Sequence, residues 1–275
     1  MTEARAHSQS PSLLGLIARS FRARRSPDRV EIARTWGRLC RYRSLALCRL
    51  AARICENADL ERIDNLAREM AEALKRDPAS AAKYTDYSYW IPFNVDRVGR
   101  LDLHRSRPLR MLDIGCGPGY FLTAASACGH EVYGIDAPAS VLTDIEARVY
   151  SVMLKALACD DRVSPLLIER FVPMALPQRD LDLITAFWIC FNRHDQPDEW
   201  GAGEWRFFVR DAMSYLRDGG VLHLELNSNV KRYGSLEWYD QETLDFFRSA
   251  GAVQRNTVRI SKGKPQGWGQ PQNPA

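Results

Sequence analysis

Residues 107–125, RPLRMLDIGCGPGYFLTAA, contain three glycines at alternate positions: Gly115, Gly117 and Gly119. The apolar run RMLDI before the glycines predicts a short buried strand, and residues 120–129 after them predict a helix that ends at a glycine. A strand, a glycine-rich turn and a helix in this order are typical of nucleotide-binding sites, because a main chain without side chains lets a ligand approach closely.

Strand and helix patterns alternate throughout the chain that follows this turn. Strict alternation of this kind predicts βαβ units, and therefore a doubly wound, mostly parallel Rossmann-like sheet with helices on both faces. The later strands are expected over 130–136, 163–172, 181–191, 221–227 and 252–260. The helices are expected over 140–158, with Ser140 as its N-cap, and over 204–216 and 240–251. In such sheets ligands bind beyond the carboxyl ends of the strands, where the strand order reverses.

The patterns divide the chain into four parts. We expect a basic, unstructured arm over 1–30, a helical cap over 31–108, a nucleoside-binding domain over 109–262 and a loose tail over 263–275. Apolar residues at helical spacing predict cap helices over 30–56 and 59–75, the second ending at Asp77-Pro78. The aromatic-rich segment 83–98 follows them, and its Tyr87, Tyr89 and Trp90 either pack the cap or cover a ligand.

Composition narrows the classes of protein that fit. Of 275 residues, 45% are hydrophobic and 26% are charged, which is typical of a globular protein. The seven cysteines form no C-x-x-C pair and no zinc-type cluster, so we expect reduced thiols in a cytoplasmic protein without a metal site. No apolar run approaches the 18 residues or so that a membrane span requires.

Positive charge is concentrated in the N-terminal arm. Residues 1–55 contain twelve Arg, no Lys and three acids, a net charge of +9, whereas the remaining chain is net acidic. A basic arm can bind nucleic acid, although no aromatic-interleaved basic stripe accompanies this one. With 32 Arg and 6 Lys in the whole chain, we favour a solvated helix in an arginine-rich protein.

The glycine spacing differs from that of a dinucleotide site. The G-x-G-x-x-G pattern requires its third glycine at position 120, where this chain has Tyr120. This difference disfavours a nicotinamide-dependent oxidoreductase. Asp113 lies two residues before the first glycine, and its carboxylate suits a ligand that carries a positive group instead of a pyrophosphate.

Four segments in order resemble the class I S-adenosylmethionine-dependent methyltransferases. They are LDIGCGPGYF (112–121), VYGIDAP (132–138), LDLITAF (181–187) and LRDGGVLHLELN (216–227), within a matching region of about 108–262. The resemblance implies S-adenosylmethionine as the cofactor. It implies that Asp113 favours the cofactor's ammonium and that Asp136 accepts hydrogen bonds from both ribose hydroxyls. The implied cofactor-binding residues are Asp113, Gly115, Cys116, Gly117, Gly119, Asp136 and Phe187.

The chain departs from the family pattern in two places. Many members carry an acid after the third strand that contacts adenine, but residues 170–177 contain none, so we expect backbone and apolar contacts there. The family sheet also ends with an antiparallel seventh strand. Because only a short tail follows 252–260, we expect that strand to be missing or rudimentary.

Polar residues cluster after the fourth strand, where a methyl acceptor is expected. His194 is the best general-base candidate, because the ordinary pKa of histidine is close to neutrality. Asn192 either positions the substrate or the cofactor's amine, or is a turn residue. We interpret His223, between Leu222 and Leu224, as structural and place Asn227 at the pocket end of the fifth strand.

The sequence therefore predicts methyl transfer to a small-molecule or sugar-type acceptor by in-line displacement. Two alternatives remain at this point. One is an RNA-modifying methyltransferase that docks through the arginine-rich arm, and the other is a non-catalytic cofactor-binding partner protein.

Overall fold

The computed structural model describes residues 45–78, 80–189, 191–192, 199–227 and 236–263. The expected basic arm, residues 30–44 of the helix predicted over 30–56, the tail beyond Gly263, and His194 with its neighbours lie outside these ranges. No helix in the described ranges is both long and apolar enough to cross a membrane.

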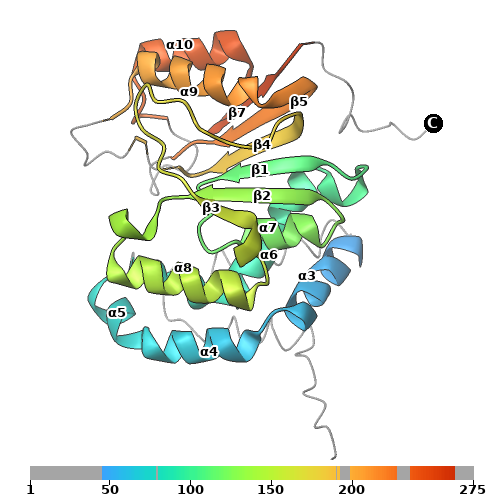
Figure 1. Ribbon diagram of the computed structural model, residues 1–275, viewed down its shortest axis with the longest axis vertical. Helices are drawn as coiled ribbons and strands as arrows, with labels where there is room; N and C mark the ends of the chain where they lie inside the picture. Colours follow the sequence, from blue (N-terminus) through green and yellow to red (C-terminus); the bar gives the residue numbers. More distant parts are fainter. Residues whose placement is uncertain (1–44, 79, 190, 193–198, 228–235, 264–275) are drawn as a thin grey trace, which may run out of the picture.

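A seven-stranded sheet forms the centre of the protein, with the strand order β3-β2-β1-β4-β5-β7-β6 (Figure 1). The first five strands pair in parallel, whereas β7 is antiparallel to both β5 and β6. This arrangement confirms the predicted doubly wound, mostly parallel sheet. The strands are β1 (Arg110–Ile114), β2 (Glu131–Asp136), β3 (Val163–Pro165), β4 (Leu181–Phe187), β5 (Leu216–Glu225), β6 (Ala252–Gln254) and β7 (Thr257–Ser261).

The seventh strand is present, so the expectation that it is missing or rudimentary is wrong. The single strand predicted over 252–260 is instead a hairpin, in which Gln254 pairs with Thr257 across a two-residue turn. Arg255 adopts a positive φ of 55° in this turn, and Asn256 anchors it by exchanging main-chain and side-chain hydrogen bonds with Leu226. The turn contains no glycine, which the usual two-residue hairpin signals such as Asn-Gly and Asp-Gly include.

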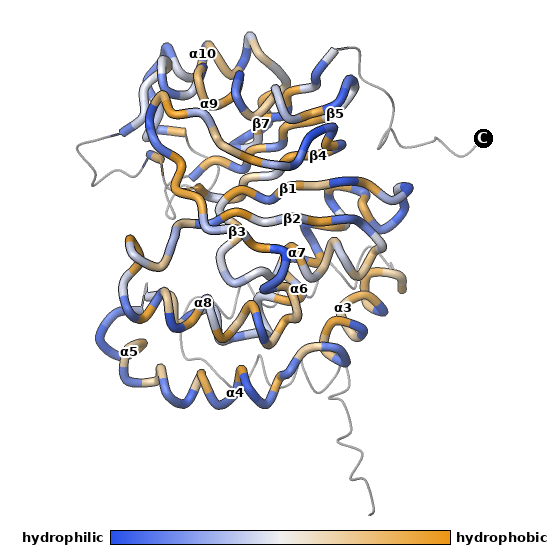
Figure 2. Tube along the Cα trace, in the orientation of Figure 1, coloured by the Kyte–Doolittle hydropathy of each residue, from blue (hydrophilic) through white to orange (hydrophobic). Residues whose placement is uncertain are grey.

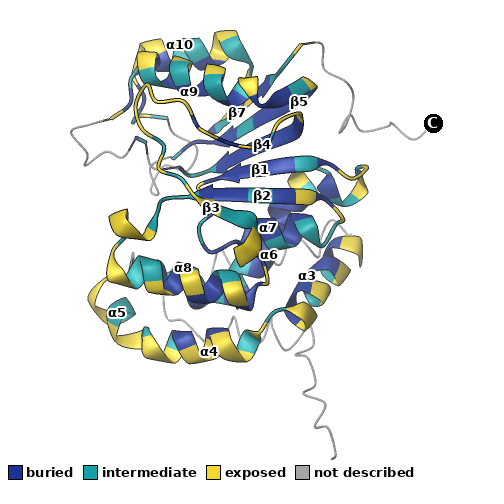
Figure 3. Ribbon diagram, viewed as in Figure 1, coloured by how far each residue is buried: buried dark blue, intermediate teal, exposed yellow. Residues whose placement is uncertain are grey.

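Helices cover both faces of the sheet (Figure 1). One hydrophobic cluster joins one face of the sheet to α3 (Leu45–Asn57), α6 (Tyr87–Arg100), α7 (Tyr120–Ser126) and α8 (Asp144–Ala156). A second cluster joins the opposite face to α9 (Ala202–Ser214) and α10 (Gln241–Ala250). Figure 2 shows the apolar strands between the two layers, and Figure 3 shows that exposed residues lie on the outer sides of the helices.

Several element boundaries differ from those predicted. Helix α8 begins after Thr143 instead of Ser140, because Thr143 and Glu146 form a reciprocal capping box. The third strand ends at Pro165, and the described residues 166–180 that lead to β4 form neither helix nor strand. Strand β5 begins at Leu216, which was predicted to be the end of the preceding helix.

The N-terminal helices pack against the α/β layers through one continuous core. The helix predicted over 59–75 is divided at Met70 into α4 (Leu60–Glu69) and α5 (Ala71–Arg76), and α5 ends at Asp77 as predicted. A short 3-10 helix, η1 (Ala81–Thr85), leads into α6, which contains most of the aromatic-rich segment. The boundary predicted at 108 between cap and domain remains a prediction.

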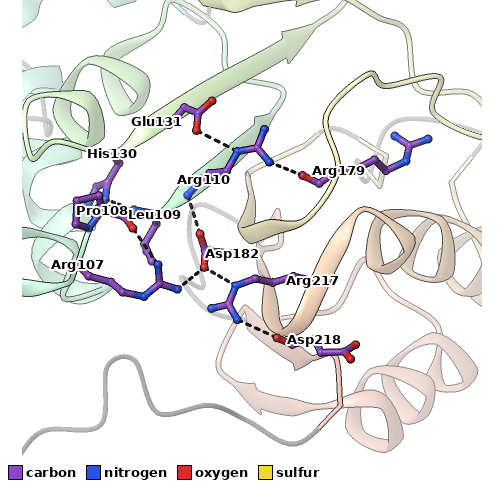
Figure 4. A network of polar contacts seen from close by, with 10 residues as sticks. All are labelled: Arg107, Pro108, Leu109, Arg110, His130, Glu131, Arg179, Asp182, Arg217 and Asp218. Carbon is purple, nitrogen blue, oxygen red and sulfur yellow. Dashed lines mark hydrogen bonds and ion pairs between the residues drawn. The ribbon is translucent and has the colours of Figure 1, made fainter.

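A charged network closes the end of the sheet opposite the glycine turn (Figure 4). Asp182 on β4 is buried and accepts hydrogen bonds from the Arg110 main-chain N–H at 2.8 Å and from Arg107 and Arg217, each at 2.6 Å. Burial raises the pKa of Asp182, but these hydrogen bonds outweigh it and hold that pKa below its ordinary value. The network ties together the first residues of β1, β4 and β5 and the segment before β1.

Candidate active site

A cavity of about 830 Å³ opens beside the glycine turn, at the carboxyl ends of β1 to β4. Its lining includes Gly115 after β1, Asp136 at the end of β2, Leu166 after β3 and Phe187 at the end of β4. The strand order reverses between β1 and β4, so the cavity lies at the switch point where doubly wound sheets bind ligands. Its volume is within the range of small-molecule sites, about 300–1,000 Å³.

Two of the three glycines face this cavity. Gly115 and Gly117 line it and adopt positive φ angles of 69° and 53°, which favour glycine. A Cβ atom on Gly117 would have only the Tyr150 hydroxyl, at 4.0 Å, within contact distance. The main chain of this residue is therefore open to a ligand.

Gly119 serves a different purpose from the one predicted. A Cβ atom at this position, where φ is 84°, would lie 2.5 Å from Cys159 Sγ and 2.8 Å from a methyl carbon of Leu154. Gly119 is not among the residues that line the cavity. Its lack of a side chain lets the start of α7 pack against α8, so its contribution to the site is indirect.

Asp136 is held in place by the glycine turn. Its Oδ2 accepts a hydrogen bond from the Gly117 main-chain N–H, and its Oδ1 accepts one from Ala137 N at 2.7 Å. Each oxygen retains acceptor capacity, because a carboxylate oxygen has two lone-pair sites. Burial raises the pKa of Asp136 above its ordinary value, although the two N–H groups oppose that rise.

Asp113 places a second carboxyl group in the cavity wall. It is 3% exposed, and its Oδ1 accepts a hydrogen bond from the Thr185 hydroxyl at 2.6 Å. Burial raises the pKa of Asp113 to about 7, against the opposing effects of Thr185 and of the Arg97 charge. A cationic ligand group would restore the charged form, so this carboxyl is suited to an ammonium.

Cys116 and Phe187 also line the cavity. Burial raises the pKa of the Cys116 thiol well above its ordinary value, so this thiol stays neutral and acts as a small apolar group. The Phe187 ring packs against Phe121, with 4.7 Å between ring centroids. All the predicted cofactor-binding residues except Gly119 therefore meet at one cavity.

Helix α6 supplies Trp90, which we considered from the sequence as a possible cover for a ligand, and two site residues that we did not identify there, Asn94 and Arg97. Trp90, Asn94 and Arg97 line the cavity, and their spacing of four and three residues places them on one face of the helix. Tyr87 is buried in the core, and neither Tyr87 nor Tyr89 is among the lining residues. The helical spacing of Trp90, Asn94 and Arg97 could have shown that they share one face. It becomes visible in the sequence only once the segment is assigned as a helix.

The residues after β4 divide into two groups. Asn192 is buried: its amide donates to Trp200 O at 2.9 Å and accepts from Trp205 Nε1 at 2.9 Å. These bonds hold the loop against α9, and Asn192 is not among the lining residues, so its geometry is that of a packing residue. The predicted base, His194, lies outside the described residues.

The two polar residues expected on β5 and beyond it are structural. Burial lowers the pKa of His223 to about 3, so its ring is neutral. The ring packs against Phe187, with 5.8 Å between the two ring centroids. The Asn227 amide donates to Ile189 O at 3.1 Å and fixes the segment after β4. Neither residue is among those that line the cavity.

Comparisons with known proteins identify the family. A search of curated proteins found no match. Structures with partial likeness include a protein from Methanococcus maripaludis, provisionally described as an S-adenosyl-L-methionine-dependent methyltransferase, with 16% identity over 73% of this chain and 93% of that one and a TM-score of 0.42. They also include CalS10, an amino pentose methyltransferase from Micromonospora echinaspora, with 21% identity over 60% and 58% of the two chains and a TM-score of 0.38. DesVI of Streptomyces venezuelae shows 14% identity over 52% and 53%, with a TM-score of 0.37, so this chain spans little more than half of either of the last two.

The match to a family model covers enough of the chain to establish the family. The family model described as a methyltransferase domain matches residues 57–255, which is well over half of the chain and contains every strand from β1 to β6. The match confirms the resemblance carried by the glycine turn and the three later segments. The chain belongs to the methyltransferase-domain family, and its activity is S-adenosylmethionine-dependent methyl transfer.

Proposed function

We propose that this methyltransferase acts on a small-molecule acceptor, sugar-type compounds included, by in-line displacement. The observation that carries the proposal is the single cavity wall that joins the glycine turn to the aromatic side chains Trp90, Trp188 and Phe191. A lining of this kind suits an organic ligand of limited size, which rings enclose and a few polar groups orient.

The residues present fit the methyl donor. Gly115 and Gly117 line the cavity, the main chain of Gly117 is open to its ribose and amino-acid portions, and Asp136 has acceptor sites free for two neighbouring hydroxyls. Asp113 offers a buried carboxyl to its ammonium. Leu142, Leu166 and Ile168 give the cavity an apolar wall beyond Asp136, and we place the adenine there.

The chemistry asks little of the protein beyond alignment. When bound, the donor supplies a methyl group attached to a sulfonium sulfur. The rest of the donor is a good leaving group, because it departs as a neutral thioether. The chain's own residues must hold the acceptor atom in line and exclude water, and positioning of this kind contributes about 7–11 kcal/mol. Where the acceptor holds a proton of ordinary pKa, we propose that His194 removes it, which adds roughly 10²–10⁴ in rate.

An acceptor screen with labelled methyl donor tests the proposal. Purified full-length protein is incubated with sugars, amino sugars, phenols and amines, and separately with RNA, while Asp136→Ala provides the matched control without a ribose acceptor. We expect label in at least one small molecule and none with Asp136→Ala. Label in RNA alone would contradict the small-molecule assignment.

The RNA alternative is tested by removing residues 1–44, which contain the basic arm and the part of the predicted cap before α3. Deletion must stop at residue 44, because Leu47 and Leu50 on α3 belong to the buried core. If the arm only solvates the surface, the truncated protein keeps the acceptor profile of the full chain. Salt-dependent RNA binding that disappears with residues 1–44 would favour the alternative.

A further inference from the structure

An apolar rim lies beside the cavity, on the connection between β3 and β4. Figure 3 shows that most of this connection is exposed where it runs beside α9. Three of its side chains are large, apolar and about half exposed: Leu167 (45%), Phe171 (55%) and Val172 (49%). Single exposed apolar side chains are ordinary on a protein surface, whereas a group of them marks a binding surface. These three residues form the apolar rim.

Contacts on both sides hold the rim at the surface. Arg170 pairs with Glu204 of α9 at 3.8 Å, and the Met174 main-chain N–H donates to Asp211 Oδ2 of the same helix at 2.8 Å. Between these anchors, Phe171 adopts a positive φ of 57°, which is unusual for a bulky residue. Strained backbone of this kind persists only where the surroundings fix it, and it is concentrated at ligand sites.

The rim is continuous with the wall of the cavity. Leu167 belongs to both, because it lines the cavity and is also exposed. Leu166 and Ile168 line the cavity too, and they pack in the same hydrophobic cluster as Phe191, a lining residue after β4. With the adenine placed against Leu166 and Ile168, Leu167 and the residues beyond it remain for the acceptor.

Helix α9 borders both the rim and the segment after β4. The Phe171 ring packs edge-on against Phe207, with 5.8 Å between ring centroids. A Cβ atom on Gly203 would lie 3.6 Å from the same ring, so the ring rests on the first turn of α9. Phe191 stacks on Trp200, just before this helix, with 3.7 Å between ring centroids. A short apolar path therefore joins the end of β4, where the acceptor is expected, to the surface.

The size of the rim favours a hydrocarbon chain over a protein partner. Three half-exposed side chains present far less than the roughly 800 Å² per partner that a stable protein–protein interface buries. A few methylene groups need no larger surface than this one. Because the rim continues the cavity wall, the chain belongs to a molecule that enters the cavity.

We propose that the acceptor is amphipathic, with its nucleophile at the end of β4 and an attached hydrocarbon chain along Leu167, Phe171 and Val172. The proposal rests on the small-molecule function given above and deepens it by naming the substrate class. The chemistry of methyl transfer is unchanged, and the rim selects the acceptor through its chain.

A homologous series of acceptors tests the proposal. Full-length protein and methyl-labelled S-adenosylmethionine are incubated with 4-alkylphenols, n-alkylamines and n-alkyl glucosides that carry ethyl, butyl, hexyl or octyl chains. Each methylene group that reaches the rim should lower KM by about two- to fourfold, because it leaves water. In Phe171→Asn/Val172→Thr, KM for the octyl compounds should rise toward KM for the ethyl compounds.

The variants are chosen to change polarity without disturbing the backbone. Asparagine tolerates the positive φ at position 171, and threonine keeps the branched shape of valine at position 172. Leu45→Thr is the matched control, because Leu45 is an exposed apolar residue of α3 (69%) that does not line the cavity. It should keep the chain-length dependence of the wild-type protein. Melting curves check that all variants fold.

Calorimetry gives the same comparison without turnover. Octyl and ethyl glucosides are titrated into protein saturated with S-adenosylhomocysteine, and the octyl compound should bind more tightly to the wild-type protein than to the double variant. This measurement decides the proposal if no head group in the series accepts the label.

A KM and an affinity that do not change with chain length would overturn the proposal, as would an unchanged chain-length dependence in the folded double variant. If the double variant instead loses binding to phosphatidylglycerol vesicles while its chain-length dependence stays, the rim contacts a membrane and the proposal is wrong. Label that enters RNA alone would refute the small-molecule function itself.

Discussion

Replacing Gly119 with alanine separates the packing role of this glycine from a cofactor-contact role. The new methyl group would meet Cys159 Sγ at 2.5 Å and a Leu154 methyl carbon at 2.8 Å, at a φ of 84°. A left-handed backbone costs a non-glycine residue about 1–2 kcal/mol, and overpacking costs about 1–3 kcal/mol. We therefore expect Gly119→Ala to lower the free energy of unfolding by about 2–5 kcal/mol, which corresponds to a fall in Tm of roughly 5–15 °C.

Gly129→Ala is the matched control. Gly129 has a similar φ of 89°, but no described heavy atom lies within 4 Å of the place that a Cβ atom would take, so only the backbone cost of about 1–2 kcal/mol applies. Adding Cys159→Ala to Gly119→Ala creates space for the new methyl group and should recover part of the loss. The measurement is thermal unfolding followed by circular dichroism, with cofactor affinity measured in parallel below the transition. Equal Tm values for Gly119→Ala and Gly129→Ala would refute the packing role, and so would a Gly119→Ala protein of normal Tm that binds no cofactor.

The remaining predictions concern titration, the charged network and the loop after β4. Because burial raises the pKa of Asp113 to about 7, the cofactor-free protein should lose stability as pH rises from about 4 to 7, and Asp113→Asn should flatten that part of a pH series of urea unfolding curves. Cofactor affinity should in turn weaken as pH falls below 7 and become insensitive in the same variant; a pH dependence shared by both proteins would exclude Asp113 as its source. Asp182→Ala should cost about 2–3 kcal/mol by urea unfolding, and because the pKa of Asp182 is lowered, its contribution should be present at neutral pH and disappear in acid; an unchanged midpoint at pH 7 would contradict the network's role. Asn192→Ala should cost about 1–3 kcal/mol with cofactor affinity retained, whereas His194→Ala should lower turnover at least tenfold with little change in Tm. Stopped-time methyl-transfer assays and melting curves on the two variants check this contrast. Lower turnover with an unchanged Tm in Asn192→Ala would instead indicate that Asn192 contacts the substrate.

The order of strands and helices was predictable because burial on both faces leaves a continuous apolar run in each central strand. The hairpin of β6 and β7 was not, because its turn residues, Arg255 and Asn256, lack the glycine of the usual hairpin signals, and a long-range bond from Asn256 to Leu226 holds the turn. The start of α8 was misplaced because Ser140 and Thr143 are both acceptable caps. Only the partner three residues on, Glu146, distinguishes them.

In the site, residues of the glycine turn and of the strand ends were predictable, whereas Asn94 and Arg97 of α6 were not. Asp113 and Asp136 follow from their positions at strand ends, where parallel strands bring their carboxyl ends together. Gly119 has the same backbone conformation as its two neighbours, and only the packing of α8 shows that it faces away from the cavity. Arg97 precedes the first strand, and the tertiary packing of α6 alone brings it beside Asp113.

Isothermal titration calorimetry on the purified full-length protein tests the central claim, that the glycine turn and Asp136 bind a sulfonium nucleoside without a phosphate. We predict one-site binding of S-adenosylmethionine, loss of that binding in Asp136→Ala, and no heat with NADH. Binding of NADH without binding of S-adenosylmethionine, or undiminished S-adenosylmethionine binding in a folded Asp136→Ala protein, would contradict it.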